Sequence, residues 1–181
     1  MIAWVEEFRS ALDSEFGPRP RVGTLATVDR EGRPRARTVV CRKVEDDGSL
    51  WVASDARSGK NAEVEHNPAA EMAFWLPSLR EQFRVAGSIW IMKDDERRTA
   101  LWSALSDSAR ALFFWDMPGA PIVEERGDNP ERIPAVAAVP SNFQVLVIRP
   151  DLVDHLDLKT HPHRRRRWET GDGWRDRAIN P

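Results

Sequence analysis

The chain has 181 residues, of which 41% are hydrophobic and 31% charged, as expected for a single globular domain over residues 1–181. The net charge of −2 argues against broad attraction to nucleic acid or to an anionic membrane, and no apolar run has the length of a membrane span. The single cysteine, Cys41, lies in an apolar run, which excludes a disulfide scaffold and favours a reducing cytoplasm.

The N-terminal half of the chain predicts one helix followed by β-hairpins. Apolar residues recur at helical spacing over residues 3–16, and Gly17-Pro18 ends this helix. Three apolar runs follow, separated by glycine-containing turns that are typical of antiparallel strands. We expect these strands at residues 22–28, 36–44 and 50–54.

A short helix and two further strands come next. Residues 58–66 predict a helix with Ser58 at its N-cap, ended by Asn67-Pro68. Residues 71–76 and 82–92 predict strands.

The C-terminal half adds helical, irregular and β-like segments. Residues 94–115 are helical in character, with a break near residues 106–108. Residues 117–140 hold five of the thirteen prolines, which predicts a loop that is either a mobile lid or an arm laid on another subunit. Strands are expected at residues 142–148, 152–158, 165–169 and 174–179. Seven to nine short strands with few helices predict a mainly β fold, a small antiparallel β-barrel with flanking helices.

Three short segments, residues 37–42, 54–60 and 80–87, set cationic or hydroxyl side chains on or beside apolar runs. A site that holds a phosphate dianion beside a flat, mostly apolar ring needs this combination. On a strand, Arg37 and Arg42 face opposite sides, so neither can duplicate the role of the other.

The segment 54–60 is the more informative of the three. It combines hydroxyl donors with two cations, Arg57 and Lys60, and Gly59 lets an anion approach the backbone closely. If Ser58 begins a helix, its free N–H groups add to an anion site.

The arginine-rich tail at residues 161–168 allows three interpretations. Four consecutive arginines could form a nucleic-acid patch, but the chain is net acidic and the run is short. His161 and His163 could bind a metal, but no cysteine or carboxylate cluster lies nearby in the sequence. The third interpretation is a strand whose alternate arginines reach a bound anion.

Taken together, these segments resemble the pyridoxamine 5′-phosphate oxidase family, the FMN-binding split-barrel proteins, from about residue 20 to the C-terminus. The family's Arg-x-Val-Leu-Leu-Lys strand reads Arg37-Thr-Val-Val-Cys-Arg42, and its Ser-Arg-Lys stretch reads Ser58-Gly-Lys60. The flavin-contacting glutamine matches Gln82. The resemblance implies an FMN site formed by Arg37, Thr38, Val39, Val40, Arg42, Ser54, Arg57, Ser58, Lys60, Gln82 and Arg165.

The same resemblance implies an antiparallel Greek-key split barrel and a homodimer with FMN at the subunit interface. Arg165 would then contact FMN from the second subunit, and Arg42 and His163 would lie near a small-molecule substrate. A cation near the flavin, Arg165 or Arg42, would favour the anionic reduced form of the ring.

The departures from the family pattern concern the substrate. The oxidases hold the substrate phosphate with Tyr, Arg and Ser, whereas this chain has no Tyr, and Trp102, Ser106 and Arg110 do not reproduce the pattern. His161 replaces a substrate-contacting arginine, and Leu156 replaces a flavin-contacting tryptophan. Because charge-assisted phosphate contacts are strong, we expect a retained FMN site beside a rebuilt substrate site.

The sequence therefore predicts a cytoplasmic FMN-dependent oxidoreductase that binds neither nucleic acid nor membrane, with no metal site and no assigned catalytic acid or base. The alternative is a flavin-binding protein without the oxidase reaction: a carrier, a sensor or a reductase of another substrate. A third hypothesis is a barrel that binds nucleic acid through the arginine tail, although Trp168 is the only aromatic residue within that run. Related split barrels use a deazaflavin or haem in place of FMN, and the serine–lysine segment favours FMN.

Overall fold

The computed structural model describes residues 2–121 and 129–181. The described residues form eight strands, β1 (Val22–Val28), β2 (Pro34–Val44), β3 (Leu50–Asp55), β4 (Ala69–Leu76), β5 (Glu81–Ile91), β6 (Phe143–Asp157), β7 (Arg164–Glu169) and β8 (Arg177–Ile179). They also form the helices α1 (Ala3–Phe16), α2 (Gly59–His66), α3 (Asp95–Ala104) and α4 (Asp107–Ala111), and the short 3₁₀ helices η1 (Leu112–Phe114) and η2 (Thr170–Asp172).

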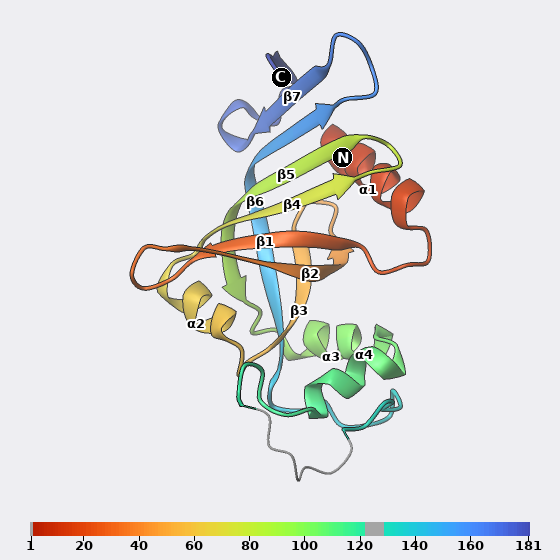
Figure 1. The fold of residues 1–181 in the computed structure, drawn as a ribbon, viewed down its shortest axis with the longest axis vertical. Helices are drawn as coiled ribbons and strands as arrows, with labels where there is room; N and C mark the ends of the chain where they lie inside the picture. The colour runs from red at the N-terminus through yellow and green to blue at the C-terminus, as the bar shows by residue number, and fades with distance from the viewer. Residues whose placement is uncertain (1, 122–128) are drawn as a thin grey trace.

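An antiparallel barrel of six strands forms the centre of the molecule (Figure 1). The strand order is β3-β2-β1-β4-β5-β6, and the barrel closes because β3 also pairs with β6. Strands β7 and β8 continue the sheet beyond β6, and we call these two strands the extension. The prediction of a mainly β, antiparallel barrel with flanking helices is confirmed.

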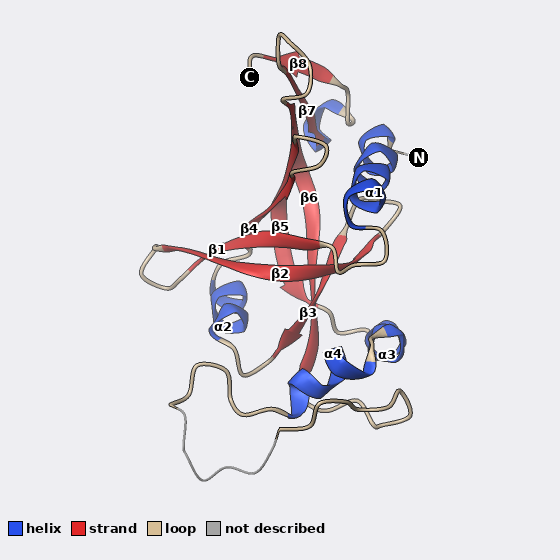
Figure 2. Cartoon of the chain, turned by 45° about the vertical axis from the view of Figure 1, so that its right-hand side comes forward, coloured by secondary structure: helices blue, strands red, loops and turns tan. Residues whose placement is uncertain are grey.

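Helix α1 lies against the sheet near the extension and buries its apolar stripe there (Figure 2). Phe8 and Leu12 are fully buried, and the ring of Phe8 lies 5.0 Å from that of Phe74 and 5.1 Å from that of Phe83. Burying one such side chain stabilises the fold by about 2–3 kcal/mol. Gly17, with φ of 53°, ends the helix where the sequence predicts.

Helices α3 and α4 cover the other end of the barrel around a second apolar core (Figure 2). Its centre is aromatic: Phe143 lies 5.0 Å from Trp102 and 4.9 Å from Phe113. The predicted helix break is confirmed, because α4 begins after Ser106, whose hydroxyl accepts a hydrogen bond from the first turn of α4.

The predicted boundary between two of the C-terminal strands is wrong. The strands expected at residues 142–148 and 152–158 are a single strand, β6, which continues through Pro150. Pro150 pairs with Gly87 where the register between β5 and β6 shifts, and proline is tolerated in a sheet at such bulges. A Cβ atom on Gly87 would lie 2.1 Å from the carbonyl oxygen of Arg149, so glycine lets the two strands approach here.

The last strand is shorter than the sequence predicts. The segment expected at residues 174–179 forms β8 only over Arg177–Ile179. The left-handed turn at Gly173, with φ of 64°, and the next residue, Trp174, with φ of 62°, delay the start of pairing.

The proline-rich loop is described in part. Residues 122–128 of the predicted loop 117–140 lie outside the described residues. The following segment lies against α3 and α4 of its own chain, since the backbone N–H of Ile133 donates to the carbonyl of Asp107 at 3.0 Å and the Trp102 indole donates to the carbonyl of Ala137 at 3.1 Å.

Cys41 is buried in the barrel core at 2% exposure. Desolvation raises the pKa of its thiol to about 12, so the thiol stays protonated and inert at neutral pH. Of the helices within residues 2–121 and 129–181, none is both long and apolar enough to cross a bilayer.

Candidate functional site

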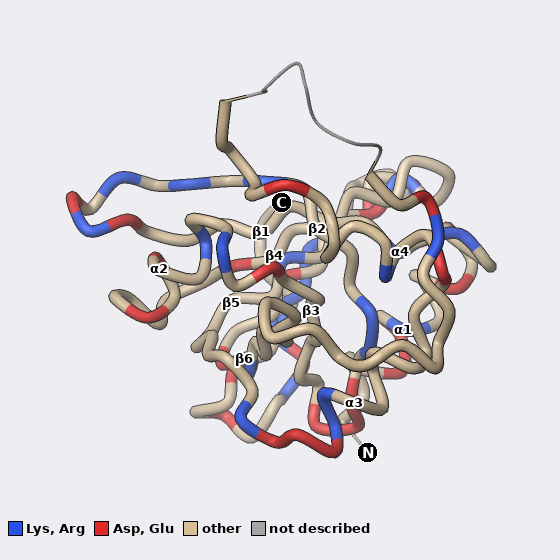
Figure 3. The backbone as a smooth tube through the Cα atoms, turned by 90° about the horizontal axis from the view of Figure 1, so that it is seen from below, with Lys and Arg blue, Asp and Glu red and all other residues tan. Residues whose placement is uncertain are grey.

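The predicted phosphate-binding residues meet where β3 ends and α2 begins, under the β1–β2 hairpin. Basic residues are spaced along one strand of this hairpin, close to α2 (Figure 3). We define the α2 cluster as Arg37 on β2 together with Ser58, Lys60 and Glu63 at and after the start of α2. Contacts between α2 and β1 hold the helix against the barrel.

Arg37 is fixed in place by three acceptors from two elements. Its guanidinium donates to the hydroxyl of Thr27 and to the carbonyl of Leu25 on β1, and it forms a 2.5 Å ion pair with Glu63 of α2. Glu63 also accepts a hydrogen bond from the Thr27 hydroxyl. The guanidinium is therefore held in one orientation, about a quarter exposed, at the edge of the α2 cluster.

Lys60 is the second cation of the α2 cluster. Its ammonium donates to the hydroxyl of Ser58 at 2.7 Å. Desolvation lowers the pKa of Lys60, and the positive charge of Arg37 lowers it further. Asp55 and Glu63 partly offset this lowering, and Glu63 is itself paired with Arg37, so Lys60 is the cation of the α2 cluster that remains for an anion.

The backbone at the start of α2 is open to such an anion. Ser58 occupies the predicted N-cap position, but its side chain does not cap the helix, because its hydroxyl donates to the carbonyl of Asp55 at 2.7 Å. The Asn61 N–H donates to the Ser58 carbonyl at 3.1 Å, which leaves the N–H groups of Gly59 and Lys60 as the donors that face an anion, and the backbone dipoles there favour negative charge. A Cβ atom on Gly59 would meet only the Glu63 carboxylate, at 3.9 Å, so an anion has room to approach. These residues fit the phosphate of FMN.

Asn61 braces the turn that carries Ser58. This buried side chain donates to the carbonyl of Asp55 and to the Ser58 hydroxyl at 3.1 Å, and lies 3.2 Å from the hydroxyl of Ser54. Ser54 is also buried, and its hydroxyl donates to the side chain of Asn61. Its predicted contact with FMN remains a prediction. Sequence analysis missed Asn61, Glu63 and Thr27, whose contacts with Ser58 and Arg37 are made in the folded chain.

Arg57 is already engaged within the chain. Its guanidinium forms a bidentate ion pair with Asp55, at 3.0 and 2.6 Å, and donates to the carbonyl of Trp115 at 3.0 Å. The hydrogen bond to Asp55 is the main cause of its raised pKa. Its predicted role at the phosphate remains a prediction, and we rank it, like the ion-paired Arg37, below Lys60, whose ammonium contacts only the Ser58 hydroxyl among the described residues.

The remaining β2 residues alternate as the sequence predicts. Val39 points into the barrel core, so it can meet a ligand only through its backbone, whereas Thr38 and Val40 lie on the outer face.

Arg42 lines a separate cavity of about 420 Å³ between the α1–β1 linker, β2 and α3. Burial lowers its pKa, and its Nε atom is buried with no hydrogen-bond partner among the described residues. Two further arginines line this cavity, but Arg21 pairs with Asp13 and Arg19 donates to backbone carbonyls. Arg42 is therefore the cation there that an anionic ligand could satisfy.

Arg110 on α4, which lies near the predicted substrate region in the sequence, is engaged within the chain. Arg110 is 2% exposed and donates to the carbonyls of Ile133, Trp102 and Leu105 and to the Asp107 carboxylate. With its donors occupied in this way, Arg110 is not available to a substrate phosphate.

Gln82 and Arg165 share the outer face of the sheet beyond the barrel core. Cross-strand pairing places Gln82 opposite Leu156, and Leu156 opposite Arg165, so the two polar residues lie about 10 Å apart. Arg165 forms a 3.1 Å ion pair with Asp154. His163, in the turn before β7, is exposed and bonds to the carbonyl of Thr160.

The predicted FMN and substrate residues therefore form two groups in one chain. Arg37 and Arg42 lie on β2 of the barrel and Lys60 on the adjacent α2, whereas Arg165 and His163 lie on or beside the extension, at the end of the molecule away from α2 and α3 (Figures 1 and 2). A site that uses both groups would need a second chain.

The lowered pKa of Lys60 predicts how FMN affinity depends on pH. A bound phosphate favours the charged ammonium and raises the pKa of Lys60, so affinity should fall as the pH rises through the value of the free protein, below 10.5. Fluorescence titration with FMN at a series of pH values measures this. Lys60→Arg, which stays charged, should flatten the profile, and an unchanged profile in that variant would exclude Lys60 as the titrating group.

Comparison with known proteins also points to an FMN-binding protein. A family model described as "Pyridoxamine 5'-phosphate oxidase, FMN-binding domain" matches residues 1–93. Pyridoxine/pyridoxamine 5'-phosphate oxidase 2 of Arabidopsis thaliana is 31% identical over 170 residues, which cover 87% of this chain and 85% of that protein. The pyridoxine/pyridoxamine 5'-phosphate oxidase of Burkholderia mallei is 29% identical over an alignment of 191 residues, covering 96% of this chain and 85% of that protein.

A solved structure extends the likeness to the whole fold. The pyridoxamine 5'-phosphate oxidase-related, FMN-binding protein from Nostoc punctiforme is 35% identical, superposes with a TM-score of 0.81, and covers 99% of this chain and 95% of its own. The barrel and extension described above are thus the split-barrel fold of that protein. The chain belongs to the pyridoxamine 5′-phosphate oxidase family of FMN-binding proteins.

Proposed function

We propose that the chain is an FMN-dependent oxidoreductase whose small-molecule substrate carries an anionic group. The observation that carries the proposal is the α2 cluster, in which Arg37 and Lys60 flank an open helix start beside an ordered hydroxyl. The relatives named as oxidases support an oxidative reaction. FMN, when bound, supplies the hydride chemistry, and the protein supplies binding, orientation and charge.

We assign Arg42 as the residue that binds the anionic group of the substrate. Its buried Nε atom lacks a partner among the described residues, and leaving a buried donor unsatisfied costs about 1–3 kcal/mol. An anionic substrate in this cavity that accepts from the Arg42 guanidinium is held by a charge-assisted bond. Arg42 therefore positions the substrate, and no residue of the chain is assigned as a catalytic acid or base.

The proposal includes a homodimer. Trp75 is 50% exposed on the outer face of β4 and pairs directly with Gln82, in the same cross-strand row as Leu156 and Arg165. A second copy packed on this face would bury the indole and bring its own Arg165 to the α2 cluster.

The dimer is tested by charging this surface. Trp75→Lys should give a monomer with weakened FMN binding, because a lysine cannot be buried there without a partner. Size-exclusion chromatography with light scattering measures the mass, and Trp90→Lys, on another exposed surface of the barrel, should stay dimeric. A monomeric parent protein, or a dimeric Trp75→Lys, would contradict the assignment.

The second candidate is a flavin-binding protein without the oxidase reaction. It is favoured by Arg110, whose donors are engaged within the chain and are not available to a substrate phosphate. The experiment is to load the protein with FMN, add pyridoxamine 5′-phosphate or pyridoxine 5′-phosphate, and follow peroxide release. Turnover would exclude this second candidate. Flavin binding without turnover would support a different anionic substrate or a non-oxidase role, and absence of flavin binding would contradict both.

A further inference from the structure

Asp154 on β6 is a carboxylate on the same outer face of the sheet as Leu156, and it pairs across strands with Arg167 of the extension. It is only 3% exposed. A charged side chain is almost never buried to this extent unless it is paired. Asp154 belongs neither to the α2 cluster nor to the lining of the Arg42 cavity, so its partners must explain its burial.

Two arginines of β7 pair with Asp154, and they do so in different ways. Arg167 binds both carboxylate oxygens, through Nε at 3.1 Å and Nη2 at 3.2 Å. Arg165 donates from Nη2 alone, at 3.1 Å. Arg167 is therefore the anchor of the carboxylate, while Nε and Nη1 of Arg165 form no hydrogen bond with the described residues.

The neighbouring arginines are more fully engaged than Arg165. Arg166 faces the opposite side of β7, where it pairs with two carboxylates. Arg84, opposite Asp154 on β5, forms a bidentate ion pair with Glu71. Arg165 is thus the arginine of this outer face whose guanidinium is engaged at one nitrogen only.

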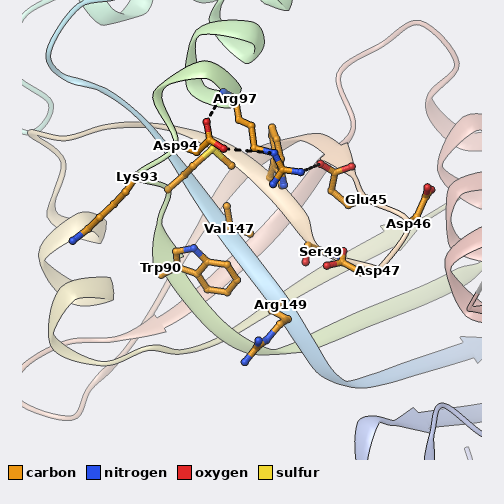
Figure 4. A pocket seen from close by; sticks show the side chains of 12 residues that line it. Glu45, Asp46, Asp47, Ser49, Trp90, Lys93, Asp94, Arg97, Val147 and Arg149 are labelled. Atoms are coloured by element: carbon orange, nitrogen blue, oxygen red, sulfur yellow. Dashed lines mark hydrogen bonds and ion pairs between the residues drawn. The ribbon is translucent and has the colours of Figure 1, made fainter.

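A cavity on another surface of the barrel has no comparable arrangement. It holds about 540 Å³ over β3, β5 and β6, and four carboxylates line it together with three cations (Figure 4). Lys93 points away from Arg149 there, and Arg97 pairs with Glu45 and Asp94. The cations of this cavity therefore do not converge on one anion.

Asp154 remains ionised beside its two arginines. Burial alone would raise its pKa, but the hydrogen bonds from Arg167 and Arg165 outweigh burial and hold the pKa below its usual value. The carboxylate thus fixes one nitrogen of Arg165. It leaves the other two nitrogens, on a side chain that is 26% exposed, for an anion.

We propose that Asp154 is a positioning residue for FMN binding across the dimer, because it orients Arg165 so that the remaining donors of Arg165 meet the FMN of the second copy. The inference rests on the dimer and the FMN site of the proposed function. A side chain that is already ordered loses less conformational entropy when the anion binds, which raises affinity. A carboxylate that only neutralised Arg165 would have the opposite effect, because it would weaken the attraction between Arg165 and an anion.

Asp154→Asn tests the proposal, because the amide keeps the shape of the side chain while it loses the charge. Titration of FMN with the full chain, followed by fluorescence quenching, should show binding weakened about tenfold, the effect of one hydrogen bond to a charged group. Arg165→Gln should itself weaken binding, and adding Asp154→Asn to it should cause no further loss. Four results would each overturn the proposal: affinity unchanged by Asp154→Asn, affinity raised by it, an equal loss in both backgrounds, or no effect of Arg165→Gln.

Asp176→Asn is the control, since Asp176 pairs with Arg166 on the other face of the extension. It should bind FMN as the parent does, and a loss equal to that of Asp154→Asn would overturn the proposal by indicating a general effect of charge on the extension. If Asp154→Asn fails to fold, Arg167→Gln takes its place in the same cycle, because it removes the anchor of Asp154. Its smaller loss should also disappear in the Arg165→Gln background, and a loss that persists there would overturn the proposal.

The parent protein separates this inference from the proposed function. A parent that binds no FMN would overturn the proposed function and this inference with it. A parent that binds FMN with the same affinity as Asp154→Asn would overturn the role of Asp154 alone.

Discussion

Replacing Lys60 by methionine should weaken FMN binding by about 10- to 100-fold, the equivalent of one lost charge-assisted hydrogen bond. The ammonium of Lys60 lies 2.7 Å from the Ser58 hydroxyl, at the open start of α2, and its pKa is lowered by burial and by Arg37. Methionine keeps the length and the apolar packing of the side chain while it removes the charge. The fold should therefore be retained.

Fluorescence quenching of FMN during titration measures the affinity of Lys60→Met. Lys43→Met is the matched control, since Lys43 lies on the same strand as Arg37 but pairs with Glu45 away from the α2 cluster. It should bind FMN as the parent does. Equal affinities for Lys60→Met and the parent would remove Lys60 from the site, and equal losses in both lysine variants would indicate a general charge effect.

Replacing Gly87 by alanine should lower the free energy of unfolding by about 3 kcal/mol, at the upper end of the usual cost of overpacking. The new Cβ atom would lie 2.1 Å from the carbonyl oxygen of Arg149 and 2.9 Å from the Cα of Pro150. Both are backbone atoms of β6, so no side-chain rotation relieves the clash. The bulge that lets β6 continue through Pro150 would have to open.

Urea unfolding of the FMN-free protein measures this cost. Gly59→Ala is the control, because its Cβ would enter open space at the start of α2, where alanine is the better helix former. Its stability should be unchanged or slightly raised. A Gly87→Ala protein as stable as the parent would contradict the close approach of the two strands.

The sequence predicts the elements whose signals are local. Helical spacing followed by Gly17-Pro18 locates α1, and alternation with glycine turns locates the first three strands within a few residues. The continuity of β6 could not be predicted in this way. Proline usually ends a strand, and its tolerance here depends on Gly87, which lies opposite in space and far away in sequence.

The candidate site likewise contains residues that the sequence indicates and contacts that it does not. Motif spacing indicates Arg37, Ser58 and Lys60, and the structure brings these three residues together. Motif spacing cannot indicate which cations already form ion pairs within the chain, because these pairs depend on tertiary contacts. Arg57 is engaged by Asp55, and Arg110 is surrounded by backbone carbonyls.

The partnership of Glu63 with Arg37 was also beyond sequence reasoning. The two residues are 26 positions apart, and they meet only because α2 crosses beneath the β1–β2 hairpin. The charge at the phosphate site is thus set by a helix and a strand together. The separation of the α2 cluster from Arg165 is likewise a property of the folded chain.

The central claim, that the α2 cluster binds FMN, is tested most directly by the visible absorption spectrum of the purified protein after incubation with FMN and removal of free flavin. We predict a bound flavin spectrum at one FMN per chain, lost in the double variant Arg37→Gln, Lys60→Met. A colourless protein, a haem or deazaflavin spectrum, or full flavin retention in that double variant would contradict it.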